Sequence, residues 1–162
     1  MPIAVIVEWF GPYKTLEALT GDVRLDWQST KRALYMALGR GNRYRYIGLS
    51  TRPQSRIGPH HRKLNCRGNR SFFVGEIITQ GISGRRRQKT PSDLSLAEHA
   101  LIRYLQPSLN ERRKYKDPND YVSIFSCFYS HKDYETPTDP LPKFPELLAF
   151  NPSSRRWSQG RC

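Results

Sequence analysis

The segment from Ala33 to Ser50 constrains the fold of this chain most strongly. It contains two apolar runs typical of β-strands, Ala33–Leu38 and Tyr46–Ser50, joined by a short polar stretch, Gly39–Arg45. That stretch supplies the glycine and asparagine residues that tight turns need. The pattern therefore predicts a β-hairpin, and the rest of the chain has to pack around it.

Alternation along the first strand of this hairpin separates its one tyrosine from its large apolar residues. Successive side chains of a strand point to opposite faces, so Tyr35 is expected opposite Leu34, Met36 and Leu38. This placement suits a phenol that lines a cleft. It also suits a core tyrosine whose hydroxyl is hydrogen-bonded, and the two interpretations stay open.

The second strand carries a glycine in its interior. Tyr44, Tyr46 and Gly48 follow the same alternation and are expected to share one face. A glycine within a strand weakens it unless another group approaches the backbone closely. A nucleic acid or a catalytic helix would account for Gly48.

Other segments predict further elements. An apolar, β-branched run at the start of the chain predicts a strand that ends at a Gly-Pro turn, and a short helix or a loop follows it. A capping signal and a 3–4 apolar spacing predict a helix late in the chain. These expectations cover Ile3–Val7, Gly11-Pro12, Thr15–Leu19, the strand Ser71–Ile78, the helix Pro91–Tyr104, the strand Tyr121–Tyr129, a polar linker or arm Ser130–Pro145, and a closing hairpin of Leu147–Phe150 with Arg156-Trp157.

The chain is strongly basic, and the basic residues are unevenly placed. The formal net charge is +13 over 162 residues. Residues 31–116 hold 20 Lys and Arg against 4 Asp and Glu, whereas both flanking segments are slightly acidic. A basic block of this kind is the electrostatic footprint of a protein that contacts phosphates, although a solvated basic face gives the same count.

Composition also limits the protein class. No apolar run approaches the length of a membrane span, and the first residues lack the pattern of a secretory signal. The three cysteines, Cys66, Cys127 and Cys162, do not form the even, regularly spaced set of a disulfide framework. We therefore expect a cytoplasmic protein of one domain, residues 1–162, with no membrane partner.

Six residues follow one another in a recognisable order: Tyr35, Tyr46 of Tyr46-Ile47-Gly48, Arg56, His60, Glu98 and Asn110. On these residues the chain resembles the GIY-YIG nuclease family. The resemblance covers residues 31–114, which leaves 1–30 as an N-terminal extension and 115–162 as a C-terminal extension. It implies an α/β fold, with a small, mainly antiparallel sheet flanked by helices and extended by N- and C-terminal strands.

The resemblance also implies an activity and a cofactor. The expected function is hydrolysis of DNA phosphodiester bonds by an endonuclease that uses one divalent metal ion, Mg²⁺ or Mn²⁺, bound by Glu98. A hard cation can bind through one carboxylate together with waters and phosphate. Glu98 lies on or beside the apolar face of its helix, so a salt bridge to one of the many arginines is the alternative partner.

The other site residues take their expected roles from the same resemblance. Tyr35 is expected to act as the base, and Tyr46 to orient the water or the phosphate. Arg56 offers its guanidinium fork to the phosphate. His60 is expected to relay a proton or hold a tyrosine, and His61 could serve instead. Asn110 is expected to hold a loop through side-chain hydrogen bonds.

The sequence departs from the family pattern at three places. Ala33 and Leu34 stand where the first motif usually has glycine and isoleucine. Gly58-Pro59 interrupts the helix expected after the second motif. The lysine that often follows that motif is absent, and Arg45 can supply the missing charge.

DNA contacts are expected from the basic segments. The candidate DNA-binding residues are Arg45, Arg52, His61, Arg85, Arg86, Arg87 and Lys89. The last four belong to a glycine-containing basic loop that could clamp a backbone or remain a solvated loop. The expected partner is double-stranded DNA, in a restriction, phage or repair role. A cutter of palindromic sites would be a homodimer, and a non-catalytic nucleic-acid-binding protein on a decayed nuclease fold is the alternative function.

Overall fold

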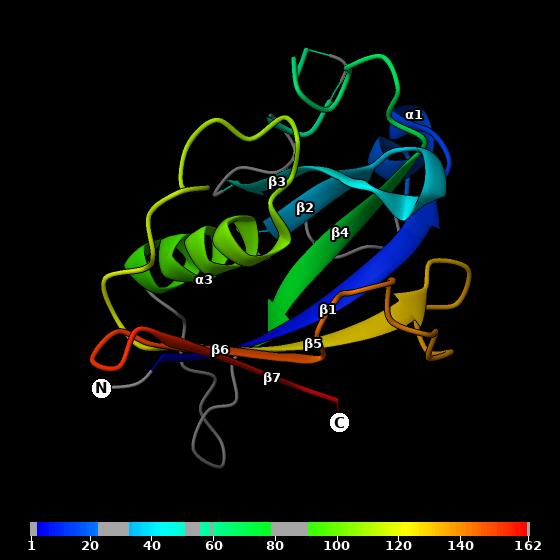
Figure 1. Cartoon of the computed structure of the whole chain (residues 1–162). Helices are drawn as coiled ribbons and strands as arrows, with labels where there is room; N and C mark the ends of the chain where they lie inside the picture. The colour runs from blue at the N-terminus through cyan, green and yellow to red at the C-terminus, as the bar shows by residue number, and fades with distance from the viewer. Residues whose placement is uncertain (1–2, 23–32, 51–55, 59, 79–90, 162) are drawn as a thin grey trace.

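The computed structural model describes residues 3–22, 33–50, 56–58, 60–78 and 91–161. A strongly curled, seven-stranded mixed sheet in the order β3-β2-β4-β1-β5-β6-β7 forms its centre (Figure 1). The strands are β1 (Ile3–Tyr13), β2 (Ala33–Leu38), β3 (Tyr44–Ser50), β4 (Ser71–Ile78), β5 (Val122–Ser130), β6 (Leu147–Asn151) and β7 (Arg156–Gly160). Two α-helices, α1 (Leu16–Thr20) and α3 (Pro91–Leu105), and a 3₁₀ turn, η2 (Arg40–Asn42), complete the described elements. The α/β class is confirmed.

The predicted hairpin forms one end of the sheet. β2 pairs antiparallel with β3 and, on its other side, with β4, and Tyr35 lies opposite Gly48. β1 joins this antiparallel unit to the C-terminal strands because it pairs antiparallel with β4 and parallel with β5. The expected hairpin at the end of the chain is confirmed as β6 and β7. The terminal segments thus extend the sheet.

The described chain packs on both faces of the sheet. α3 covers one face, where Leu34, Met36 and Leu38 join a large core with strands β1 and β5. Tyr35 lies on the other face, in a second core that includes Ala37 and residues of α1. The predicted separation of Tyr35 from the large apolar side chains of its strand is confirmed, and both faces of β2 are buried.

The second strand of the hairpin does not alternate as expected. The register shifts between Ala37, which lies opposite Tyr46, and Leu38, which lies opposite Tyr44. This shift is a β-bulge at Arg45, and an extra residue in a strand moves the side chains beyond it to the other face. Tyr44 therefore packs against the core under α3 and Tyr46 against the opposite core, so the expectation of a shared face is wrong.

The predicted turn at Gly11-Pro12 is also corrected. β1 runs through these residues to Tyr13, and its register with β4 shifts between Phe10 and Tyr13. Proline cannot donate to a strand ladder and is tolerated where a bulge interrupts the pairing. The signal marked an irregularity within a strand, not its end.

The helix predicted after Pro91 is confirmed as α3. Its apolar face is also confirmed, with Leu94, Ala97 and Leu101 at most 1 % exposed. Residues 130–145 form no separate arm, because Phe144 enters the core under α3 and the Tyr44 hydroxyl donates to the Pro142 carbonyl at 2.7 Å. Among the described residues, no helix is long and apolar enough to span a membrane.

Candidate active site

Three ring side chains from separate parts of the chain meet above the β2–β3 hairpin. Tyr35 comes from β2, Tyr46 from β3, and His61 from the turns that follow β3. The Tyr35 hydroxyl lies 3.0 Å from Nε2 of His61. The ring centroids lie 6.0 Å apart for the two tyrosines, 5.5 Å for Tyr35 and His61, and 5.4 Å for Tyr46 and His61. We call these three residues the Tyr-Tyr-His cluster.

Gly48 makes this arrangement possible. The ring of Tyr35 lies across the backbone of its cross-strand partner Gly48, and a Cβ there would stand 2.6 Å from Cζ of Tyr35. The close approach that a strand glycine indicates is therefore made by a tyrosine ring within the sheet. The expected approach of a nucleic acid or a helix is not needed to explain this glycine.

A backbone amide that donates to His61 sets the directions of the hydrogen bonds in the cluster. The amide of Leu64 donates to Nδ1 of His61 at 3.2 Å, so the proton of the neutral imidazole is on Nε2. His61 then donates to the Tyr35 hydroxyl oxygen, and Tyr35 donates its own proton to Tyr46. The chain of donors runs from His61 through Tyr35 and ends at the Tyr46 oxygen.

The two tyrosines have different electrostatic surroundings. Burial raises the pKa of Tyr35 far above its ordinary value, and its side chain is only 3 % exposed. Burial also raises the pKa of Tyr46, but the hydrogen bond received from Tyr35 opposes this increase. The charges of Lys63 and Arg56 oppose the increase as well, but the pKa of Tyr46 stays above its ordinary value.

The structure corrects which histidine holds a tyrosine. His60 is exposed, whereas His61 is partly buried and contacts both tyrosines. The described residues 60–70 form turns instead of continuing a helix, so helical spacing does not govern the direction of these side chains. His61, the alternative that the sequence left open, thus occupies the position beside the tyrosines that was expected of His60, and its DNA-binding role stays a prediction.

Protonation of His61 is expected to destabilise the fold. Burial lowers the pKa of His61 below its ordinary value, and the nearby charge of Arg56 lowers it further. Because the unfolded chain then binds more protons, the free energy of unfolding falls as pH decreases from about 6.5. Chemical denaturation of the wild type and of His61→Asn between pH 7.5 and 5 measures this contribution as a steeper slope in the wild type. His60→Asn is the matched control and keeps the wild-type slope. Equal slopes in the wild type and in His61→Asn would contradict the prediction.

Glu98 lies beside this cluster on α3. Its side chain is 18 % exposed and pairs with Arg113, whose Nη1 donates to Oε2 at 2.7 Å. Burial raises the pKa of Glu98, whereas the Arg113 charge and a hydrogen bond from the Leu49 backbone lower it. The carboxylate in turn raises the pKa of both tyrosines. Glu98 therefore occupies the expected position near Tyr35 and Tyr46, and its ion-pair alternative is also realised.

Asn110 closes the outer edge of β3. Its Oδ1 accepts from the Ile47 amide at 3.0 Å and its Nδ2 donates to the Ile47 carbonyl at 2.8 Å. The amide of Leu109 donates to the Arg45 carbonyl at 2.7 Å. Asn110 thus holds its loop by side-chain hydrogen bonds, as expected, and supports the motif strand instead of facing the tyrosines directly.

Loss of the Asn110 amide is expected to weaken this edge. Asn110→Ala leaves the Ile47 amide and carbonyl without their partner, which should cost about 1–3 kcal/mol of unfolding free energy. Chemical denaturation measures the loss, and hydrogen exchange at the Ile47 amide locates it. Glu111→Ala removes only an exposed ion pair with Lys63 and is the matched control, for which little change is expected. Equal stability of Asn110→Ala and the control would show that the edge does not need this side chain.

Arg45 is engaged within the protein. Its Nε donates to Oδ1 of Asn69 at 2.8 Å, and its Nη2 donates to the Arg67 carbonyl at 3.1 Å. Asn69 then donates to the carbonyls of Lys63 and Leu64. Arg45 therefore shapes the loop that presents His61, and its DNA-binding role stays a prediction.

Lys63 places a positive charge near Tyr46 that the sequence did not predict. Its charge lowers the pKa of Tyr46, and its Nζ lies 2.9 Å from Oε1 of Glu111. Its only signal in the sequence was its place in the basic stretch after the second motif. Arg56, an expected site residue, is exposed and lowers the pKa of Tyr35, Tyr46 and His61, so it lies close to the cluster.

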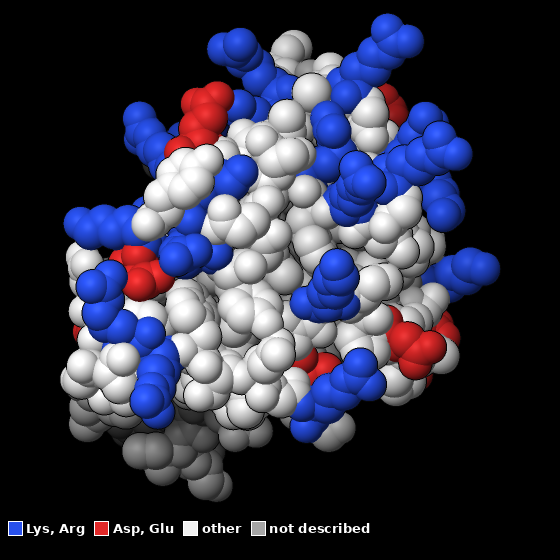
Figure 2. Space-filling model, viewed as in Figure 1, with Lys and Arg blue, Asp and Glu red and all other residues white. Residues whose placement is uncertain are grey.

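Part of the expected DNA interface cannot be placed. Arg52, Arg85, Arg86, Arg87 and Lys89 lie outside the described residues. Within the described segments, exposed basic side chains come from the β2–β3 turn, the loop after β3 and the segment after α3. They include Arg40, Arg43, Arg56, Arg62, Arg67, Arg70, Arg112 and Lys116. Figure 2 shows Lys and Arg side chains gathered over β3 and the loop that follows it.

A single carboxylate fits one kind of metal site. Among the described residues no group of three or more His, Cys, Asp or Glu side chains could hold a metal ion. Zinc sites need such groups, but Mg²⁺ and Mn²⁺ bind through one or two carboxylates plus waters and substrate phosphates. Glu98 fits a hard cation of this kind, with Arg113 as a competing partner of its carboxylate.

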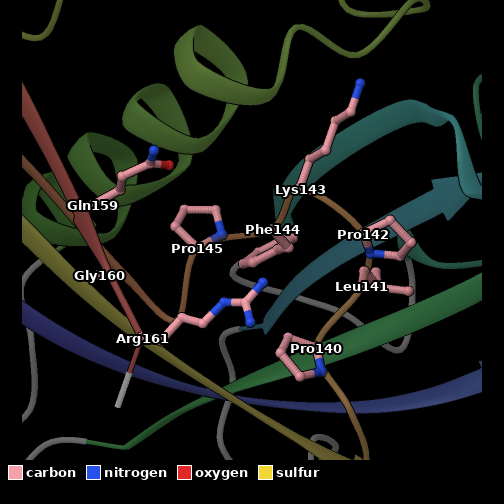
Figure 3. A pocket seen from close by; sticks show the side chains of 9 residues that line it. All are labelled: Pro140, Leu141, Pro142, Lys143, Phe144, Pro145, Gln159, Gly160 and Arg161. Atoms are coloured by element: carbon pink, nitrogen blue, oxygen red, sulfur yellow. The ribbon is translucent and has the colours of Figure 1, made fainter.

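The described chain also has a groove that lies apart from the candidate site. The groove, of about 400 Å³, lies between residues 140–145 and the end of β7, as Figure 3 shows. It is lined mainly by prolines, Leu141 and Phe144, and Lys143 and Arg161 add two basic side chains to the lining. It contains none of the residues of the Tyr-Tyr-His cluster.

No protein family, no curated protein and no solved structure matches the chain.

Proposed function

We propose that this chain is a metal-dependent endonuclease of the GIY-YIG type, which hydrolyses phosphodiester bonds of double-stranded DNA. One observation carries the proposal: Tyr35, Tyr46 and His61 form one hydrogen-bonded cluster beside the Glu98 carboxylate, which comes 63 positions after Tyr35 in the chain. Arg56, Lys63 and the exposed basic residues around β3 surround this cluster. Phenols can transfer protons, a carboxylate can bind a cation, and fixed positive charges can stabilise the phosphate charge during phosphodiester hydrolysis.

The direction of the hydrogen bonds favours Tyr46 as the group that accepts the proton of the attacking water. Tyr35 is buried, its hydroxyl oxygen accepts a hydrogen bond from His61, and its proton is donated to Tyr46. Its hydroxyl group is therefore poorly placed to contact the substrate. Tyr46 is more exposed, and the Tyr35 hydrogen bond stabilises its deprotonated form. This exchanges the roles expected from the sequence, which made Tyr35 the base.

In the proposed reaction, water attacks the phosphorus and Tyr46 transfers the proton. A water oxygen bonds to phosphorus, its proton passes to Tyr46 Oη, and the Tyr46 hydroxyl proton moves to a phosphate oxygen or to solvent. The P–O bond to the leaving sugar oxygen breaks, and that oxygen takes a proton from solvent. Mg²⁺ or Mn²⁺ bound at Glu98 would supply Lewis-acid stabilisation of the phosphate charge.

The positive side chains bind and orient the phosphate. The Arg56 guanidinium can donate two parallel hydrogen bonds to phosphate oxygens, and the Lys63 ammonium adds a second charge beside Tyr46. The exposed arginines of the β2–β3 turn and of residues 60–70 extend this positive surface along the substrate. Affinity for DNA should therefore fall steeply as salt increases.

A cleavage assay tests the proposal. Supercoiled plasmid and single-stranded DNA are incubated with the full chain and with Glu98→Gln, in Mg²⁺ or in chelator. The proposal expects plasmid cleavage that needs the metal and is lost in the variant, which keeps its fold and its affinity for DNA. Metal-independent cleavage, or equal cleavage by Glu98→Gln, would overturn it.

The Arg113–Glu98 ion pair favours one alternative, a nucleic-acid-binding protein on a decayed nuclease fold. A carboxylate paired at 2.7 Å with a guanidinium does not need a metal for charge balance. Tight, salt-sensitive binding of both DNA substrates without cleavage, at any Mg²⁺ concentration, would support this function instead.

A further inference from the structure

Arg113 is fixed against one turn of α3. Nη1 of Arg113 donates to the Ser95 carbonyl at 2.8 Å and to Oε2 of Glu98 at 2.7 Å, and Nη2 donates to Oγ of Ser95 at 2.8 Å. Both protons of Nη1 are thereby used, and the guanidinium cannot leave Glu98 without losing its other contacts. The backbone of Arg113 is in the left-handed region with φ of 66°, an unusual conformation for a residue with a side chain.

Other contacts already tie this segment to α3. Nε of Arg103 pairs with Oδ1 of Asp117 at 2.9 Å, and Nε2 of Gln106 donates to the Lys114 carbonyl at 2.6 Å. The segment after α3 is therefore tied to the helix at Lys114 and Asp117, just beyond Arg113. The Glu98 contact is not required merely to hold this loop in place.

The consequence for Glu98 is electrostatic. The carboxylate is the ligand expected to bind the divalent cation, and it is partly buried, so screening by water is limited. A cation that binds Glu98 must share it with a full positive charge at hydrogen-bonding distance. The negative charge of a substrate phosphate offsets this repulsion, because it adds anionic ligands on the open side of the cation.

We infer that Arg113 is a built-in counter-cation that lowers the affinity of Glu98 for Mg²⁺ or Mn²⁺ in the DNA-free protein, so that the metal binds together with the substrate phosphate. This inference rests on the proposed function and concerns the regulation of the same site. Arg113 acts through Glu98 and is a positioning residue.

Mn²⁺ titrations followed by electron paramagnetic resonance test the inference without DNA and without catalysis. The full chain is compared with Arg113→Gln, Arg113→Lys and Arg103→Gln. The last variant is the matched control, because it removes a second arginine–carboxylate pair between α3 and the same segment. Thermal unfolding of each variant checks that the fold is retained.

Arg113→Gln is expected to bind Mn²⁺ about tenfold more tightly than the wild type, because a unit charge beside the ligand is gone. The gain should vanish in the double variant Glu98→Gln/Arg113→Gln. Arg113→Lys, which keeps the charge, and Arg103→Gln are expected to bind as weakly as the wild type. If Arg113→Gln does not fold, Arg113→Lys still tests the inference, because a tenfold gain there would show that the charge is irrelevant.

The inference is overturned if Arg113→Gln binds Mn²⁺ no more tightly than Arg103→Gln, or if the gain persists without Glu98. Plasmid cleavage by the same proteins separates this failure from failure of the proposed function. If the wild type cleaves DNA but Arg113→Gln gains no Mn²⁺ affinity, only the counter-cation role of Arg113 is rejected. A Glu98-dependent gain in Mn²⁺ affinity without DNA cleavage supports the cation site and rejects the proposed nuclease function.

Discussion

Tyr46→Phe is expected to lower the rate constant of Mg²⁺-dependent DNA cleavage by about 10²–10⁴-fold, the usual contribution of a general acid–base group. The hydroxyl of Tyr46 is the end of the donor chain from His61 through Tyr35, and no other phenol of the cluster is as exposed. Phenylalanine keeps the ring in place against Tyr35 and His61. DNA affinity should therefore change little, and single-turnover kinetics should assign the loss to the chemical step.

Two tyrosines provide controls for this prediction. Tyr44→Phe removes a hydroxyl from the same strand, but this hydroxyl faces the opposite core and donates to the Pro142 carbonyl, so cleavage should stay near wild type. Tyr35→Phe removes the donor to Tyr46 without removing the proton acceptor, and an intermediate loss is expected. A larger loss in Tyr35→Phe than in Tyr46→Phe would restore Tyr35 as the base and contradict our assignment.

Gly48→Ala is expected to reduce the free energy of unfolding by about 1–3 kcal/mol, the range for an overpacked interior. The new methyl group would stand 2.6–2.7 Å from Cζ, Cε2 and Oη of Tyr35. The ring cannot move aside easily, because it is 3 % exposed and hydrogen-bonded to His61 and Tyr46. The substitution should therefore also break the Tyr-Tyr-His cluster and abolish cleavage.

Gly58→Ala is the matched control for this substitution. No atom lies within 4 Å of a Cβ built on Gly58, which belongs to the chain that leads to His61. Chemical denaturation of both variants separates the effect of the Tyr35 contact from the general effect of replacing glycine by alanine. Equal stability of the two variants would show that Gly48 is not required by the tyrosine ring.

Local patterns predicted the elements of the site, because they depend on neighbours in the sequence. Strands β2 and β4, helix α3 and the buried face around Tyr35 all follow from apolar periodicity and capping signals. Gly48 correctly indicated that another group lies close to its backbone, but that group is the ring of a cross-strand tyrosine. That contact depends on the hairpin register and cannot be derived from the glycine alone.

The remaining features depend on contacts between distant residues. The bulge at Arg45, which separates Tyr44 from Tyr46, is stabilised by hydrogen bonds to a loop more than 20 residues later. His61, and not His60, contacts the tyrosines because of the turns formed by the chain around it. Gly58-Pro59 indicates a break in a helix but does not predict which histidine then points to the tyrosines. The parallel pairing of β1 with β5 joins the two ends of the chain, and no periodicity encodes it.

Single-turnover cleavage in water enriched in oxygen-18 tests the central claim, that water hydrolyses the phosphodiester at the Tyr46–Glu98 site. We expect Mg²⁺-dependent cleavage in which one labelled oxygen enters the phosphate end of the product and none enters the sugar hydroxyl, as mass spectrometry of the product ends would show. Failure to cleave DNA under any metal condition, or a product phosphate without the label, would contradict it.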